Sequence, residues 1–155
     1  MCWQCDHPEE ALDDYLDLLR GKILLRGWIV QCVEDDRHPF AYTIGLHAQG
    51  WPELLVTGLA PKRARWLLNT FAKRTRSDLE PVAGQQVRLP AGTRLELVEV
   101  AHPDAHMGMA IAIEGSGISA MQLVWADDRG RWPWAPNFDD GHRLQPVLGV
   151  RGRPG

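Results

Sequence analysis

The first seven residues contain side chains that could bind a metal ion or undergo redox chemistry. Cys2 and Cys5 form a Cys-x-x-Cys pair in the segment MCWQCDH, and His7 follows two positions later. Two thiolates at this spacing can bind one zinc ion, and an imidazole can supply a third ligand. A helix that begins directly after the pair would favour the thiolate form, as in a redox-active dithiol. Alternatively, both cysteines are small apolar residues in an ordered N-terminal segment.

We take Cys2, Cys5 and His7 as the leading metal ligands, with zinc or another divalent cation as the cofactor. Cys32 or a distant histidine would have to complete the site. The redox interpretation is weaker, because a thioredoxin-like site needs a strand before the pair and only Met1 precedes this one. The sequence has no second Cys-x-x-Cys pair, so it lacks the full zinc-ribbon pattern.

Histidines and a glutamate are candidates for general acid–base catalysis in a metal-independent enzyme. The candidates are His47, Glu53, His106 and His142. His102 and His106 are four residues apart, the spacing at which two imidazoles share one helical face. Pro103, however, favours the first helical turn and places His102 at or before the cap, so the two rings need not converge. Two partly exposed histidines without a function are the simpler interpretation.

Three tryptophans near the C-terminal end could form an aromatic wall beside a ligand. They are Trp125, Trp132 and Trp134, and the sequence contains seven tryptophans in all. Thr43, on the polar face of the segment AYTIGLH, would bound the same cleft and help to bind a small molecule. Asp127 and Asp128 lie between the tryptophans, where a tight turn is favoured over a cation site.

A basic amphipathic helix is predicted over residues 61–77. Its positive residues are Lys62, Arg63, Arg65, Lys73, Arg74 and Arg76, and Leu67, Leu68 and Phe71 form part of its apolar stripe. This surface could bind a phosphate, an acidic partner or RNA, with Trp66 as a stacking platform. The alternative, which we favour slightly, is a solvated face balanced by acidic groups elsewhere.

Composition indicates an ordinary globular protein. The chain has 155 residues, of which 45% are hydrophobic and 24% are charged, and its net charge of −3 disfavours a general nucleic-acid binder. The apolar runs are too short for a membrane span, and the N-terminus lacks the pattern of a signal peptide. Three cysteines are an odd number, which argues against a secreted disulfide framework. We therefore expect a cytoplasmic protein with reduced thiols. The oligomeric state cannot be read from the sequence.

Hydrophobic periodicity predicts an α+β fold. Apolar residues at Leu12, Leu16, Leu19 and Ile23 predict a helix over 8–26 that Gly27 ends. Alternation over 27–47 predicts a hairpin, and further strands are expected within 52–61, 84–101 and 118–132. Residues 102–117 resemble a short helix. The expected architecture is a single domain over 1–149, with a mainly antiparallel sheet of five or six strands, two or three helices, and a flexible basic tail at 150–155.

Several strings together resemble a bacterial family catalogued as domain of unknown function 4262. They are MCWQC, FAYTIGLH with PELLVTGL after it, MQLVWADDRGRWPW and QPVLG. The resemblance runs from Met1 to about Gly149 and implies a small, soluble, single-domain protein, but it implies no activity. The residues that match the recurrent strings are Cys2, Cys5, Tyr42, Thr43, Gly45, Pro52, Glu53, Gln122, Asp127, Asp128, Gly130, Pro133, Trp134, Gln145 and Pro146. Because both cysteines are among them, we expect a small-ligand- or metal-binding domain.

Overall fold

The computed structural model describes residues 8–34, 38–77 and 80–151 of the chain. The helices are α2 (Pro8–Arg26), α3 (Pro61–Ser77), α4 (Pro103–His106) and α5 (Gly108–Glu114). The strands are β1 (Ile29–Val33), β2 (Phe40–Ile44), β3 (Glu53–Thr57), β4 (Gln86–Arg88), β5 (Arg94–Glu99) and β6 (Ala120–Trp125). Two short 3₁₀ turns, η1 (His47–Gln49) and η2 (Phe138–Gly141), complete the order. The helices predicted over 8–26 and 61–77 therefore have the expected bounds.

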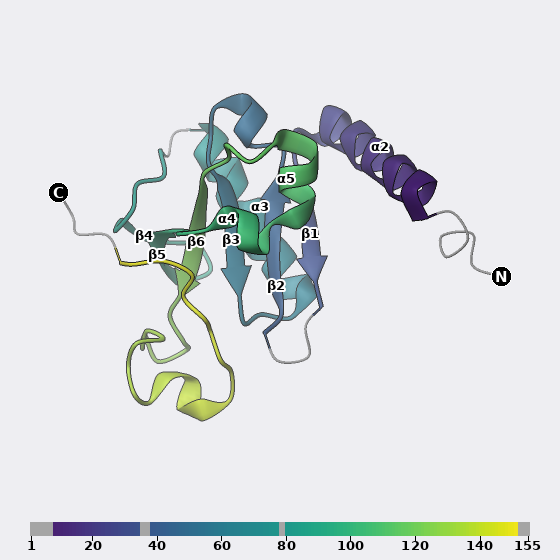
Figure 1. Ribbon diagram of the computed structural model, residues 1–155. Helices are drawn as coiled ribbons and strands as arrows, with labels where there is room; N and C mark the ends of the chain where they lie inside the picture. The colour runs from purple at the N-terminus through teal and green to yellow at the C-terminus, as the bar shows by residue number, and fades with distance from the viewer. Residues whose placement is uncertain (1–7, 35–37, 78–79, 152–155) are drawn as a thin grey trace.

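All six strands belong to one sheet, in the order β1-β2-β3-β6-β5-β4 (Figure 1). Neighbouring strands are antiparallel except for β3 and β6, which are parallel. The parallel pair arises because the chain forms α3, the β4–β5 hairpin, α4 and α5 between these two strands. The predicted α+β fold with a mainly antiparallel sheet is confirmed. Its two edges are β1 and β4.

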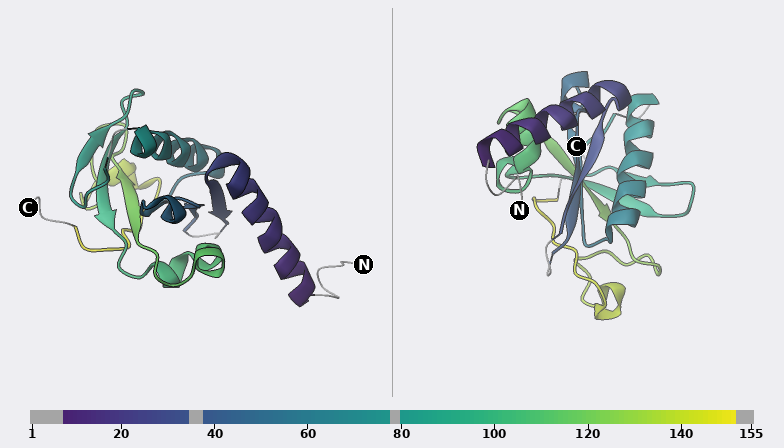
Figure 2. Two further views of the ribbon diagram at one scale, coloured as in Figure 1. Left: turned by 90° about the horizontal axis from the view of Figure 1, so that it is seen from above. Right: turned by 90° about the vertical axis from the view of Figure 1, so that its right-hand side faces the viewer.

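Helices cover both faces of the sheet (Figure 2). On one face, α3 buries Leu67, Leu68 and Phe71, each at most 2% exposed, as its apolar stripe predicts. On the other face, α5 packs against β2, where the hydroxyl of the buried Tyr42 accepts a hydrogen bond from Met109 N at 3.0 Å. Tyr42 thus anchors the beginning of α5, which gives this family-string residue a structural role.

α2 packs against the sheet with part of its length and extends past the sheet edge with the rest (Figure 1). Leu16 and Leu19 are buried, as the periodicity predicts. Leu12 belongs to the same predicted stripe but is 47% exposed, because its turn has no sheet beneath it; for this residue the prediction was wrong. Gly27 ends the helix at φ +91°, with its N–H bonded to Ile23 O at 2.7 Å. Neither α2 nor any other described helix is long and apolar enough to cross a membrane.

Two glutamine side chains attach the irregular C-terminal segment to the last strand. The Gln122 amide donates to Pro146 O at 2.8 Å and accepts from Leu148 N at 2.7 Å. Gln145 bonds to both backbone groups of Trp125, accepting from N at 2.9 Å and donating to O at 2.8 Å. Gln122 thus provides hydrogen-bond partners for the backbone of Pro146 and Leu148, and Gln145 does the same for the backbone of Trp125. An additional strand would otherwise have to provide these partners. Gln122 and Gln145 therefore hold the C-terminal segment against β6.

Arg151 lies in the segment predicted to be a flexible tail at 150–155, yet it is anchored. Its guanidinium makes two bonds to the nearly buried Glu96, at 2.8 and 3.0 Å. It also lies over the ring of Trp134, 3.8 Å from the centroid. Of the predicted tail, residues 152–155 lie outside the described residues.

Candidate functional site

The leading metal site cannot be placed on the fold. Cys2, Cys5 and His7 lie outside the described residues. Among the side chains described within residues 11–34, 38–77 and 80–151, no group of three or more His, Cys, Asp or Glu is arranged to hold a metal ion. Cys32, considered above as a further ligand, is a free cysteine on β1. The zinc hypothesis therefore stays a prediction about the N-terminal segment.

Glu53 has a carboxylate that is occupied by backbone amides. Its side chain is fully buried and accepts hydrogen bonds from Leu46 N at 2.7 Å, Gly45 N at 3.1 Å and His47 N at 3.3 Å. The Thr43 hydroxyl lies within 3.5 Å and in turn accepts from the backbone of β3. These contacts stabilise the turn after β2 and leave no open side on which Glu53 could act as a general base.

A second carboxyl group lies beside Glu53. Gly45 N also donates to Glu114 Oε1 at 3.0 Å, and Glu114 Oε2 is buried without a partner among the described residues. Burial raises the pKa of both Glu53 and Glu114, and for Glu53 the neighbouring Glu114 raises it further. Two such groups titrate as a pair and hold a proton at higher pH than an isolated glutamate.

Gly45 is the centre of this arrangement because no other residue fits there. Its φ is +122°, and a Cβ atom would lie 2.7 Å from Gly27 O and 3.0 Å from Ile23 Cγ2. The turn therefore joins the end of α2, the end of β2 and the start of β3 at one point. Thr43, Gly45 and Glu53 occur together in the family strings, and their contacts explain this as architecture.

The proposed catalytic histidines come from three separate parts of the fold. His47 is exposed at the start of η1, although its N–H reaches the glutamate. His106 ends α4, and His142 follows η2 in the C-terminal segment. None of them contributes to a cluster of metal ligands within the described residues. Burial raises the pKa of Glu114 and the charge of His47 opposes that rise, so His47 acts on the carboxyl pair, and the predicted acid–base pair of a histidine with Glu53 stays a prediction.

The three tryptophans of the predicted wall separate into two groups. Trp125 is 3% exposed and belongs to the core, where its Nε1 donates to Thr57 O at 2.9 Å. Trp132 and Trp134 stack with ring centroids 5.4 Å apart. Arginines of the same chain lie over both rings, Arg94 over Trp132 and Arg151 over Trp134. Thr43 is fully buried and does not face a cleft with them.

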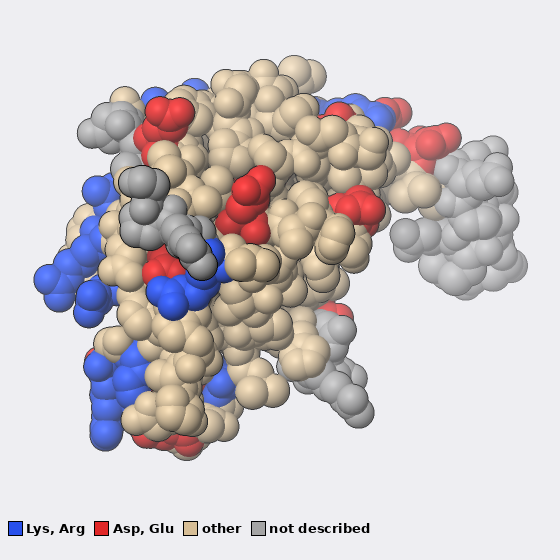
Figure 3. Space-filling model, turned by 60° about the vertical axis from the view of Figure 1, so that its left-hand side comes forward, with Lys and Arg blue, Asp and Glu red and all other residues tan. Residues whose placement is uncertain are grey.

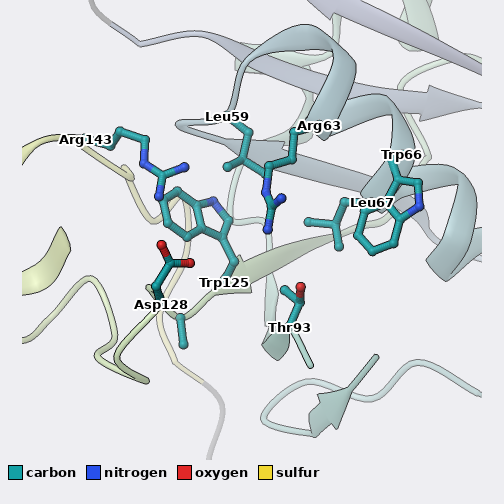
Figure 4. A pocket seen from close by; sticks show the side chains of 9 residues that line it. Leu59, Arg63, Trp66, Leu67, Thr93, Trp125, Asp128 and Arg143 are labelled. Atoms are coloured by element: carbon teal, nitrogen blue, oxygen red, sulfur yellow. The ribbon is translucent and has the colours of Figure 1, made fainter. Parts of the chain in front are cut away.

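A small cavity lies between the start of α3 and the C-terminal segment (Figure 4). Arg63, Thr93, Asp128 and Arg143 contribute its polar groups, and Arg143 covers the ring of Trp125 at 4.6 Å. Its volume is only about 20 Å³. Ligand pockets for small molecules have about 300–1,000 Å³, whereas a space of this size holds about one water molecule.

A much larger open groove runs along β1 at the edge of the sheet. Its volume is about 780 Å³. The lining comes from α2 (Tyr15, Leu19, Lys22, Arg26), from the segment 28–32 (Trp28, Ile29, Val30, Gln31, Cys32) and from α3 (Arg65, Asn69, Lys73). We call this feature the edge groove. In the right-hand view of Figure 2, β1 faces the viewer between α2 and α3.

Every charged side chain among the described residues that line the edge groove is positive. Lys22 and Arg26 come from α2, and Arg65 and Lys73 come from α3. None of these four cations forms an ion pair with a carboxylate of the residues that the structure describes. On the face shown in Figure 3, by contrast, acidic and basic groups lie next to each other in several places.

The positive side chains of the helix predicted over 61–77 therefore lie at several different sites. Arg65 and Lys73 face the edge groove, whereas Arg63 lines the small cavity. Arg76 lies over the ring of Trp28, 5.4 Å from its centroid, and Arg74 donates to Arg88 O at 3.2 Å. Trp66, the predicted stacking platform, is 42% exposed outside the lining of the groove.

Sequence reasoning missed half of the groove. Lys22 and Arg26 received no role, because they lie on a different helix about 40 residues before Arg65. The available signal was their spacing of four residues, which places two cations on one face of α2. Only the arrangement of α2 against β1 brings them opposite the charges of α3.

Comparison with known families matches the description Domain of unknown function (DUF4262) to residues 22–139. The match covers most of the chain. This protein belongs to that family. The DUF4262 match begins at Lys22 and includes all groove residues except Tyr15 and Leu19, whereas Cys2 and Cys5 precede it. No curated protein and no solved structure matches the chain.

Proposed function

We propose that this DUF4262 protein is a binding module whose edge groove recognises an anionic partner. The observation that carries the proposal is the convergence of four cations, two from α2 and two from α3, on one groove without a facing carboxylate among the described residues. The whole chain has a net charge of −3, so this positive lining is a local segregation of charge. A concave site lined by one sign of charge attracts ligands of the opposite sign.

Two features of the groove favour binding over catalysis. Its volume of about 780 Å³ suits a ligand of considerable size. Its lining contains no Asp, Glu or His among the described residues, so the three side chains that most often act as general acid or base are missing from that part of the lining. Tyr15, Trp28 and the partly buried Cys32 supply apolar contact surface between the charges.

The experiment is a binding titration with two polyanions, a fluorescent acidic peptide and a fluorescent thymidine oligonucleotide. The test variant replaces Lys22, Arg26, Arg65 and Lys73 by Gln. The matched control replaces four exposed cations outside the groove, Lys62, Arg63, Arg88 and Arg129, by Gln. We expect at least about tenfold weaker binding, which corresponds to about 1.4 kcal/mol, for the groove variant alone.

Higher salt should weaken the binding of the wild-type protein, because exposed charges are screened. If neither polyanion binds the wild-type protein at low salt, the proposal fails. It also fails if the control variant loses as much affinity as the groove variant, since the effect would then reflect net charge alone. Circular dichroism of both variants verifies that the fold is retained.

Two further expectations remain proposals beside this one. The first is a metal, with zinc as the leading choice, at Cys2, Cys5 and His7; the Cys-x-x-Cys spacing with a histidine two positions later supports it. The second is a cytoplasmic location with reduced thiols. It rests on the odd cysteine count of three, and the free thiol of Cys32 is consistent with it.

A further inference from the structure

The free edge of β1 forms the floor of the edge groove. β1 pairs with β2 on one side only, because it is the outermost strand of the sheet. Beyond that ladder, the backbone of Ile29–Val33 makes no hydrogen bond to the described residues. An edge strand presents alternate N–H and C=O groups that can pair with another extended chain.

The lining shows that the groove follows this edge and not a face of the sheet. Five consecutive residues, 28–32, contact it. Side chains that follow one another in a strand point to opposite faces, so a cavity that reaches all five must run along the outer edge. The contacts agree: Gln31 points to α2, 3.4 Å from Tyr15 Oη, whereas Trp28 points to α3 and donates to Asn69 Oδ1 at 2.9 Å.

α2 and α3 therefore form two walls on either side of the position that a further strand would occupy. Each wall carries two cations, Lys22 and Arg26 on α2, Arg65 and Lys73 on α3. A strand placed beside β1 at the usual spacing of about 4.8 Å would direct its side chains alternately toward the two walls. Acidic side chains on both faces of that strand would then meet opposite charge on both sides.

We propose that the anionic partner is an acidic peptide segment in extended conformation, which adds to the sheet as a strand beside β1. This inference rests on the proposed function. Main-chain hydrogen bonds to the edge supply affinity, and the lysines and arginines of the walls select acidic side chains. A segment of about five residues spans the strand, since each residue of a strand extends it by about 3.3 Å.

The same charges disfavour the other occupants of this edge. A second copy of the chain, paired through β1, would bring the four cations of one groove against the four of the other, and like charges facing each other across an interface are destabilising. A nucleic acid could satisfy the charges, but its backbone has no amide groups to complete the hydrogen bonds of a strand edge. The positive charges of the groove and the free backbone edge of β1 therefore both fit an acidic peptide.

The test uses the capped peptide Glu-Val-Glu-Glu-Val-Glu, which as a strand directs two carboxylates to each wall, and two N-methylated versions of it. One version is methylated at residues 1, 3 and 5, the other at residues 2, 4 and 6. In a paired strand, alternate amides face β1 and the others face away, so methylation blocks pairing in only one version. We expect one version to bind at least about tenfold more weakly and the other to bind within about threefold of the parent.

The outcomes distinguish the two proposals. If both methylated peptides bind like the parent, and the groove variant binds none of them, the charged groove is right and strand addition is overturned. Tighter binding of a six-nucleotide thymidine probe than of the parent peptide overturns the peptide assignment in favour of a nucleic acid. A concentration-dependent dimer in sedimentation, dispersed by the groove variant or by peptide, would assign the edge to a second copy. If no probe binds, both proposals fail.

Hydrogen exchange supplies a readout on the protein itself. Peptide pairing should slow the exchange of alternate amides within Ile29–Val33, because outward-facing amides acquire a partner. Binding by charge alone would leave these amides unchanged and would contradict strand addition.

Discussion

Removal of the Glu53 side chain should destabilise the fold far more than removal of Glu114, although both carboxyl groups accept a hydrogen bond from the same amide. In Glu53→Ala, the amides of Leu46 and His47 lose their only acceptor among the described residues. Gly45 N keeps Glu114 as its acceptor. In Glu114→Ala, Gly45 N keeps Glu53 instead, and no other described backbone amide loses a partner.

The magnitude follows from the burial of these groups. A buried donor left without an acceptor costs about 1–3 kcal/mol; the Leu46 amide is buried and the His47 amide only partly buried, so the two together account for at most about 6 kcal/mol. Relief of the repulsion between two buried carboxyl groups offsets part of this cost. We expect Glu53→Ala to lower the free energy of unfolding by about 3–4 kcal/mol at neutral pH. Glu114→Ala should change it by less than about 1 kcal/mol.

Urea unfolding of both variants and the wild-type protein, followed by tryptophan fluorescence, measures these differences. Glu53→Gln is the intermediate case, because one oxygen remains to accept from Leu46, and its loss should fall between the other two. A loss below about 1 kcal/mol for Glu53→Ala would refute the structural role of this residue. So would an equal loss for the two alanine variants, since the two carboxyl groups would then not differ in the way that their partners require.

Three further predictions concern the Glu53–Glu114 pair, the Asp127 carboxylate and the N-terminal thiols. Because burial raises the pKa of the Glu53–Glu114 pair, the folded protein keeps a proton that the unfolded chain releases at about pH 4–5. The stabilisation from this proton is complete below the pKa of the unfolded chain and is lost as pH rises through the pKa of the folded protein. The free energy of unfolding should therefore fall above about pH 5. Glu114→Gln should make this fall smaller, as measured by urea midpoints at several pH values. Asp127 accepts hydrogen bonds from Arg129 N, Arg131 N, Arg131 Nε and Asp139 N, and these donors lower its pKa to about 2 against the effect of burial. The stabilisation by the Asp127 carboxylate is therefore present above about pH 4 and is lost as pH falls toward about 2. Asp127→Asn should lower the free energy of unfolding by about 2–4 kcal/mol. As a control, Asp128→Asn at the exposed neighbour should lower it by less than about 0.5 kcal/mol in the same urea assay. Elemental analysis of purified protein should find about one zinc per chain, and Cys2→Ser with Cys5→Ser should remove it; wild-type protein without metal would end this hypothesis.

The position of Glu53 shows that residue type alone does not identify a catalytic site. Glu53 was a candidate acidic partner for a catalytic histidine because of its residue type. In the fold, β3 lies between β2 and β6 in the interior of the sheet, so its first residue is fully buried, and the turn after β2 directs three amides at the carboxylate. Its burial depends on the strand order, which involves β6, about 70 residues away.

The local elements, in contrast, follow from signals within a few residues. The bounds of α2 agree with the spacing of Leu16 and Leu19 and with Gly27 at its end. The apolar stripe of α3 is buried as its helical spacing requires. Exposure of Leu12, at 47%, was beyond such signals, because it depends on how far the N-terminal part of α2 extends past the sheet.

Helix bounds, the hairpin, the α+β class and membership in the DUF4262 family could all be read from the amino-acid order, because each rests on side chains close together along the chain. Tertiary structure alone decided that β1 is an edge strand and that the cations of α2 and α3 face each other across it. These features join segments about 40 residues apart, and such contacts arise only when the sheet and its two helical layers have assembled.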